Sequence, residues 1–321
     1  MINPLAKVIP VLRSETKFRR KLILCVIAIS VVMTQAANSQ TYDNMQPPGI
    51  NFDQAQFRLW VPEGLQSVRA ILVLVPGSNG DGRDQVESPL WRSLAQEQGL
   101  ALVGVHMTDK MHEDMFIEHY IDVARGSGDA FLTALDQLGE MSGHPEIGDA
   151  PLLLWGMSAG GEFNYEFALW RPDRVAGFVV NKGGIYYSAL ASSDARNVPG
   201  LFFVGTDDLA FRNDIIRGIF SINRRAHALW ALIEQDGVGH EVAGSDIIAA
   251  AFYREVLDER LSADSTLTSL NADDGFFCDP SSRSCVSVDG AEAPTVPVSW
   301  LATDGLTELW KDAQSATAAS E

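Results

Sequence analysis

Short, continuous apolar runs recur along the middle of the chain, and segments with helical spacing separate them. The runs cover residues 70–75, 101–105, 151–155, 175–180, 201–204 and 227–233, and a weakly alternating run covers 58–61. The helical segments cover 85–98, 121–141, 161–170, 211–225 and 245–261. Apolar runs without alternation are typical of parallel strands that are buried on both faces. The alternation of strand and helix therefore predicts an α/β fold, a doubly wound and mostly parallel sheet with helices on both faces.

The first 37 residues have the pattern of a secretory signal peptide. Basic residues precede an apolar run at 22–33, and the small residues Ala36 and Ala37 follow it. The run is shorter than the roughly 20 apolar residues of a membrane-spanning helix. We therefore expect a secreted or periplasmic protein that is cleaved near Ala36 or Ala37. An uncleaved membrane anchor is the alternative.

The composition changes after residue 262, where Ser, Asp, Pro and Ala predominate. We expect three parts: a signal peptide (1–37), a main domain (38–262) and a C-terminal tail (263–321). The tail has too few apolar residues for a core of its own, so its tryptophans are expected to pack on the main domain.

Removal of the signal peptide would leave two cysteines, Cys278 and Cys285, both in the tail. In an oxidising compartment a pair at this short spacing favours a disulfide over a metal site, because a metal would need more thiol or histidine ligands nearby.

The charge balance excludes two classes of partner. The chain has 24 Lys and Arg against 42 Asp and Glu, a net charge of −18. Loss of residues 1–36 removes six basic residues and one acid, which takes the net charge to −23. Nucleic acids and anionic membranes both require a positive surface, so we expect neither nucleic-acid binding nor stable membrane association after signal cleavage. With 46% hydrophobic residues the chain can fill a sizeable core. The oligomeric state stays open.

The clearest chemical motif is Gly-Met-Ser-Ala-Gly at 156–160, between the apolar run at 151–155 and a helical segment. In this context G-x-S-x-G is typical of a nucleophile elbow. The tight turn needs glycines, and it presents the serine hydroxyl at the carboxyl edge of the sheet, beside the positive end of the next helix. The candidate nucleophile is Ser158. A glycine turn whose serine only caps the helix is the alternative.

A serine nucleophile needs a base, and the base needs an orienting acid. Asp208 closely follows the buried run at 201–204, and His240 lies in a glycine-rich loop after the last run. The neighbouring Asp207 is an alternative acid. The order Ser158, Asp208, His240 differs from that of chymotrypsin-like and subtilisin-like enzymes.

Three motifs in this order resemble the α/β-hydrolase superfamily, and the resemblance covers roughly residues 70–261. Members usually carry the acid three residues after a strand-ending glycine, as Gly205 and Asp208 would be placed. The resemblance implies an α/β-hydrolase fold with Ser158, Asp208 and His240 as a catalytic triad.

The resemblance also implies an oxyanion hole made of two backbone N–H groups. One belongs to Ala159, directly after the nucleophile. The other is expected from Ser78 by position, with Asn79 as the alternative. The family's frequent His-Gly is replaced here by Pro76-Gly77, which leaves the choice between these two donors open.

The short segment between the runs at 175–180 and 201–204 leaves no room for a large lid domain. The chain is therefore similar to secreted, cap-less serine esterases such as polyhydroxyalkanoate depolymerases and feruloyl esterases. This implies an exported serine hydrolase that cleaves small or polymeric carboxylic esters through an acyl-enzyme on Ser158. We expect Tyr186 and Met157 to contact the substrate.

We expect neither a metal nor a cofactor. His112 and Glu113 begin like the H-E-x-x-H zinc motif, but Phe116 stands in place of its second histidine. The loop at 79–84 is only faintly similar to a calcium loop, because no glutamate closes it.

Two alternative functions remain. A serine peptidase of the prolyl-oligopeptidase type is disfavoured, since no propeller domain precedes the hydrolase part. A non-catalytic binding protein on a hydrolase fold would have no use for the serine and the histidine together. The acyl and alcohol specificity is left open.

Overall fold

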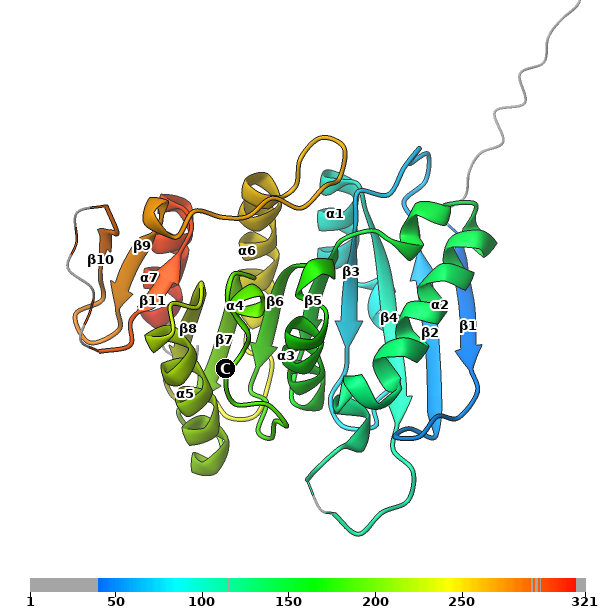
Figure 1. The fold of residues 1–321 in the computed structure, drawn as a ribbon, viewed down its shortest axis with the longest axis horizontal. Coiled ribbons are helices and arrows are strands. Elements are labelled where there is room, and N and C mark those ends of the chain that lie inside the picture. The colour runs from blue at the N-terminus through cyan, green and yellow to red at the C-terminus, as the bar shows by residue number, and fades with distance from the viewer. Residues whose placement is uncertain (1–39, 115, 290, 292–293, 295, 316–321) are drawn as a thin grey trace, which may run out of the picture. The chain divides into compact units, whose positions relative to one another are not determined.

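The computed structural model describes residues 40–114, 116–289, 291, 294 and 296–315, so the predicted signal peptide lies outside the described residues. The main feature is an eight-stranded sheet (Figure 1). Its strands are β1 (Thr41–Gln46), β2 (Gln54–Trp60), β3 (Ala70–Val75), β4 (Leu100–Thr108), β5 (Leu152–Gly156), β6 (Val175–Asn181), β7 (Gly200–Gly205) and β8 (Trp230–Gln235). They lie in the order β1-β2-β4-β3-β5-β6-β7-β8. β2 is antiparallel to both its neighbours, and all pairs from β4 to β8 are parallel.

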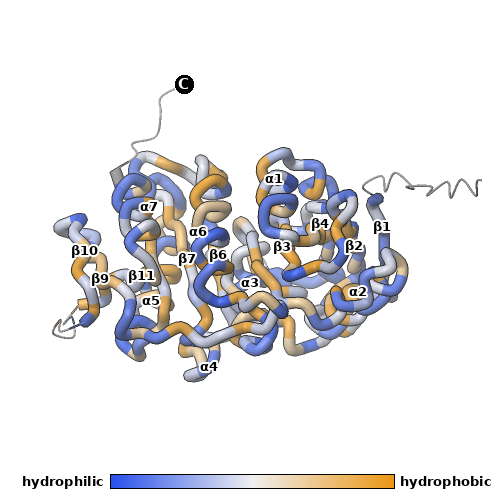
Figure 2. The backbone as a smooth tube through the Cα atoms, turned by 90° about the horizontal axis from the view of Figure 1, so that it is seen from above, coloured by the Kyte–Doolittle hydropathy of each residue, from blue (hydrophilic) through white to orange (hydrophobic). Residues whose placement is uncertain are grey.

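Helices cover both faces of this sheet (Figure 2). One face carries α2 (Ser127–Ser142), α3 (Ala159–Trp170) and α5 (Ala210–Arg225), and the other carries α1 (Pro89–Gln98), α6 (Ser245–Arg260) and α7 (Asp304–Ser315). Alternate residues of β3, such as Val73 and Leu74, belong to the two opposite cores. β3, β5, β6 and β7 are consequently buried at every residue, which explains their continuous apolar runs. The predicted α/β architecture is confirmed.

Two helices begin later than the periodicity predicts. In the segment 85–98 a short 3-10 turn precedes α1, which begins at Pro89. The residue before a proline disfavours the α conformation, so the helix cannot extend through it. In the segment 121–141, α2 begins only at Ser127. It follows Gly126, whose φ of 127° is a conformation that glycine tolerates and a helix excludes.

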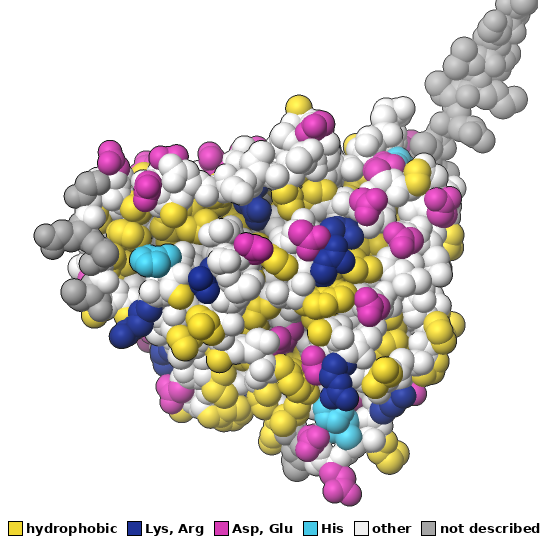
Figure 3. Space-filling view, in the orientation of Figure 1, with side chains coloured by type: hydrophobic (Ala, Val, Ile, Leu, Met, Phe, Trp, Pro, Cys, Tyr) yellow, Lys and Arg dark blue, Asp and Glu magenta, His cyan; other side chains and the backbone are white. Residues whose placement is uncertain are grey.

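The carboxyl edge of the parallel strands is open. β6 and β7 are joined by residues 182–199, which hold only the short helix α4 (Ser193–Arg196), so no lid domain stands there. Residues 109–114 and 116–118 extend from the same edge, at the bottom of Figure 1, and histidine, basic and acidic side chains gather there in Figure 3. None of the described helices is long and apolar enough to cross a membrane.

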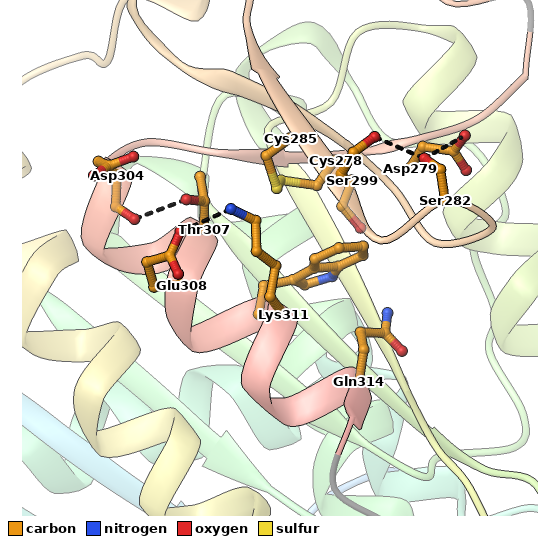
Figure 4. The surroundings of a disulfide bond; sticks show 12 residues. Cys278, Asp279, Ser282, Cys285, Ser299, Asp304, Thr307, Glu308, Lys311 and Gln314 are labelled. Carbon is orange, nitrogen blue, oxygen red and sulfur yellow. Dashed lines mark hydrogen bonds and ion pairs between the residues drawn. A yellow bond between two sulfur atoms is a disulfide. The ribbon is translucent and has the colours of Figure 1, made fainter.

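The C-terminal tail packs beside β8. It contains a three-stranded sheet of order β10-β9-β11, with β9 at Phe276–Asp279, β10 at Ser284–Ser287 and β11 at Ser299–Leu301. A disulfide between Cys278 and Cys285 joins β9 to β10 (Figure 4). On α7, Trp310 is 1% exposed and donates from Nε1 to the carbonyl oxygen of Leu232 at 2.7 Å. Trp310 shares its buried cluster with Ile233 of β8, so the tail extends the core of the main sheet.

We expect Trp310→Ala to lower the free energy of unfolding of the whole chain by about 3–5 kcal/mol, because it empties a large site in a shared core. Urea unfolding followed by circular dichroism measures this value. Lys311→Ala, at the next and partly exposed position of α7, is the control and is expected to change stability by less than about 0.5 kcal/mol. A loss below about 1 kcal/mol in Trp310→Ala would contradict the shared core.

Candidate active site

The turn between β5 and α3 holds Ser158 in a strained backbone conformation. Its φ is 55° and its ψ is −128°, a combination that residues with a Cβ rarely adopt. A Cβ at Gly156 would overlap the carbonyl oxygen of Gly160, and a Cβ at Gly160 would overlap that of Val75. Both glycines are therefore needed for the turn to close against its neighbours. The N–H of Ser158 donates to the carbonyl oxygen of Asn181 at 2.9 Å, which ties the turn to the end of β6.

Asp208 and His240 form a pair at the same edge, after β7 and β8. Nδ1 of His240 lies 2.7 Å from Oδ2 of Asp208. An ionised carboxylate only accepts, so Nδ1 carries the proton. The side chain of Asp208 is 2% exposed. Asp207 is exposed, and its backbone N–H donates to Val238. Of the two acids that the sequence left open, the structure brings Asp208 to the histidine.

The environment of Asp208 keeps it ionised. Its Oδ1 accepts from the N–H of Leu209 at 2.7 Å and from Nη1 of Arg212 at 3.1 Å. Burial favours the neutral acid, but the hydrogen bond from His240 and these further contacts outweigh it and lower the pKa of Asp208 below its ordinary value. A negative charge thus stays beside the imidazole at neutral pH.

Two backbone N–H groups next to the serine have no hydrogen-bond acceptor within the part of the chain that the structure describes. Ala159 is the first residue of α3, where an N–H has no partner within the helix. The loop after β3 lies against the turn, since a Cβ at Gly77 would be 3.6 Å from the serine Cβ. In this loop the N–H of Asn79 donates to the hydroxyl of Tyr120 at 3.3 Å. The N–H of Ser78 has no acceptor among the described residues.

A cavity of about 200 Å³ opens beside the serine. It is lined by Ser78, Phe116, Glu118, Ser158, Glu162, Gly184, Ile185, Phe211 and Arg212. A larger space of about 600 Å³ follows the loop after β4 and shares Ser78, Phe116 and Glu118 with it. The serine therefore lies at one end of an extended recess. Another cavity, of about 210 Å³, contains none of the residues discussed above. It is lined by residues of the tail, of the end of α5 and of the chain between α5 and β8.

Comparisons with known proteins bear on the fold of the chain. No protein-family model and no curated protein sequence matches the chain. Among solved structures, it is similar to a ferulic acid esterase, with a TM-score of 0.52 and 15% identity over 68% of this chain and 97% of that chain. A poly(3-hydroxybutyrate) depolymerase from Bordetella parapertussis has a TM-score of 0.51 and 16% identity over 68% of this chain and 90% of that chain. The chain has the α/β-hydrolase fold. At such identities the likeness concerns the fold alone.

The two residues predicted to contact substrate lie beside the recess of this α/β-hydrolase fold. Tyr186 packs its ring edge-on against Tyr165, with 4.9 Å between the ring centroids, and its hydroxyl is buried without a hydrogen-bond partner among the described residues. Met157 is partly buried. Neither belongs to the lining of the cavity, whereas Gly184 and Ile185, just before Tyr186, do. Substrate contact by Tyr186 and Met157 stays a prediction.

Lys182 is a site residue whose role the sequence did not reveal. It follows β6 with a φ of 54° and is 0% exposed. Its Nζ donates to Oδ1 of Asn181 at 3.0 Å and to Oε1 of Gln235 at 2.5 Å. Burial lowers the pKa of Lys182 to about 8, although the negative charges of Asp208 and Glu241 act to raise it. Its positive charge favours the ionised form of Asp208.

The sequence analysis also did not identify Glu162 and Arg212, which both line the cavity beside the serine. Glu162 lies on α3 one turn after Ser158 and is 4% exposed. Burial, with a contribution from the charge of Glu118, raises the pKa of Glu162 to about 7, although the N–H groups of the loop after β6 oppose the shift. The sequence held no local signal for this burial, because Glu162 and Glu166 interrupt the apolar positions of the segment after the serine and acids on a helix are usually exposed.

The loop after β4 brings together groups that could hold a metal. One ligand atom from each of His112, Asp114 and His119 lies within 4.8 Å of the others, and the two imidazole rings stack at 4.0 Å. Nε2 of His112 also lies 3.2 Å from Oδ2 of Asp109. Imidazole and carboxylate ligands suit divalent transition metals.

Proposed function

We propose that the chain is an exported serine hydrolase that cleaves carboxylic esters through an acyl-enzyme on Ser158. The proposal depends chiefly on one observation, the placement at one sheet edge of the strained serine turn and of an Asp208–His240 pair separated by 2.7 Å. An esterase and a depolymerase share the fold, which supports an ester as substrate. The sequence pattern of the first 37 residues and the disulfide support export.

In this mechanism Oγ of Ser158 attacks the acyl carbon while Nε2 of His240 takes its proton. Asp208 holds the Nδ1–H and stabilises the imidazolium. The N–H groups of Ala159 and Ser78 bind the oxyanion. The alcohol leaves with the proton from His240, and water, deprotonated by the same nitrogen, releases the acid from the acyl-enzyme.

Proton transfer requires contact between Ser158 and His240. Among the hydrogen bonds of the described residues, none joins the serine hydroxyl to the imidazole. Catalytic contacts of this kind are often long without substrate and tighten in the complex. We therefore place the formation of this bond in the substrate-bound state.

The recess suits a large or chain-like ester. The carboxyl edge carries no lid domain between β6 and β7, and the space of about 600 Å³ continues from the cavity beside the serine. A polymeric ester could lie along it while one acyl unit enters the smaller cavity.

The test uses p-nitrophenyl acyl esters and aminoacyl p-nitroanilides, with and without a fluorophosphonate probe. We expect ester turnover that stops when the probe labels Ser158, as located by peptide mass spectrometry, and little anilide turnover. Comparable anilide turnover would indicate the peptidase alternative. Absence of both labelling and turnover would indicate the binding protein.

A further inference from the structure

Glu162, which lines the cavity beside Ser158, carries a buried oxygen that the described chain does not satisfy. Oε1 of Glu162 accepts from the N–H of Gly184 at 2.6 Å and from that of Ile185 at 3.0 Å. Oε2 of the same carboxyl group is buried and has no hydrogen-bond partner. A buried polar atom without a partner costs free energy, so such atoms in native proteins usually meet a ligand or an ordered water.

Glu162 and Ser158 belong to the same site. Glu162 lies in the first turn of α3, and Ser158 directly precedes that helix. Both residues line the cavity of about 200 Å³. One water occupies about 30 Å³ in the liquid, so the space admits a group of several heavy atoms.

Loop anchoring alone does not account for Glu162. Glu166, one turn further along α3, is 6% exposed and accepts from the N–H groups of Tyr187 at 2.7 Å and Ser188 at 2.9 Å. It thus anchors the same loop in the same way, but it does not line the cavity. Anchoring of the loop after β6 accounts for the contacts of Oε1 in each glutamate. It does not account for the burial of Oε2 of Glu162 without a partner among the described residues.

The charges around the cavity favour a ligand that donates hydrogen bonds. Glu118 adds a second acid to the lining, and the one cation of the lining, Arg212, is paired with Asp208 at 3.1 Å. The aromatic rings of Phe116 and Phe211 supply apolar surface. A substrate carboxylate would be repelled by the acids, whereas a short apolar chain with a hydroxyl or ammonium group would match the surroundings.

We propose that this cavity is an acyl subsite in which Oε2 of Glu162 accepts a hydrogen bond from a hydroxyl or ammonium group on the second or third carbon of the acyl chain. The inference rests on the proposed function and specifies its substrate class. The raised pKa of Glu162, about 7, agrees with a carboxyl group that gains charge when a cation reaches it.

Two isosteric series of p-nitrophenyl esters test the subsite. On the second carbon the esters are isobutyrate, lactate and alaninate, and on the third they are isovalerate, 3-hydroxybutyrate and 3-aminobutyrate. Within each series a methyl group is replaced by hydroxyl or ammonium at nearly constant size. In the wild-type chain we expect kcat/KM for a donor-bearing ester to exceed that of its methyl isostere by about tenfold or more. The ammonium and hydroxyl esters show which donor is preferred.

The variants assign the preference to the carboxyl group. Glu162→Gln replaces one carboxylate oxygen by an amide donor, and Glu162→Asp moves the carboxylate away from the cavity. Both variants are therefore expected to bring the ratio of kcat/KM for the donor-bearing ester to kcat/KM for its methyl isostere (the donor-to-methyl ratio) close to one. Glu166→Gln is the matched control and is expected to keep the wild-type ratio. Thermal melting of each variant confirms folding. If neither Glu162 variant folds, the donor-to-methyl ratio of the wild-type chain alone tests the subsite.

Two outcomes overturn the subsite: equal kcat/KM for donor and methyl esters in both series of the wild type, or an unchanged ratio in a folded Glu162 variant. Failure of the proposed function differs from both. In that case no ester of either series is hydrolysed in a Ser158-dependent manner.

Discussion

Ser158→Ala is expected to lower kcat for ester hydrolysis by about 10⁴–10⁶-fold, because it removes the atom that forms the acyl-enzyme while the oxyanion donors remain. The fold should be retained for two reasons. None of the hydrogen bonds among the described residues uses the serine hydroxyl, and alanine, like serine, carries a Cβ, so the backbone strain at φ 55° does not change. Steady-state hydrolysis of p-nitrophenyl esters gives kcat, and fluorophosphonate labelling should disappear with it.

The control for this substitution is Ser93→Ala. Ser93 lies on α1, on the opposite face of the sheet from α3, so its loss should leave kcat within a few-fold of the wild type. Matching melting curves would show that both variants are folded. Activity of Ser158→Ala within a few-fold of the wild type would exclude this serine as the nucleophile.

Asp208→Asn is expected to lower kcat by about 10⁴-fold, whereas Asp207→Asn should change it by no more than a few-fold. Asn can present an amide N–H to Nδ1 of His240, which favours the wrong tautomer and withdraws the base from the serine. Asp207 is exposed and has no contact with the imidazole among the hydrogen bonds of the described residues. The measurement is kcat for the same ester in both variants over a range of pH.

The two variants carry the same Asp→Asn change at adjacent positions. Their comparison therefore separates the role of the acid from a general effect of charge loss. Similar melting temperatures would show that the variants are equally folded. Equal losses of activity, or a larger loss in Asp207→Asn, would mean that the 2.7 Å pair is not the catalytic one.

The serine turn was predictable because its constraints are local. A tight connection between a strand and a helix excludes side chains at 156 and 160, and glycine at both positions satisfies this before any partner is known. The buried strands were equally visible, since each is apolar on both faces. β1 was not predicted. It is an edge strand, largely polar and mostly exposed, and its place depends on pairing with β2.

The choice between neighbouring groups was not predictable in the same way. Asp207 and Asp208 differ by one step along the chain, and only the packing of β7 beside β8 turns one of them toward His240. Ser78 and Asn79 were likewise open as candidate donors. The structure pairs the N–H of Asn79 with the hydroxyl of Tyr120, 41 residues away, so Ser78 is the donor that we propose.

The sequence by itself determined the α/β order of the elements, the serine turn and the pair of cysteines, because periodicity, steric exclusion and short spacing are properties of consecutive residues. The tertiary structure alone decided that Asp208 meets the histidine, that Lys182 is buried, and that Glu162 is buried in the wall of the cavity beside the serine. Burial of a charge depends on which distant segments cover it, and no local pattern contains that information.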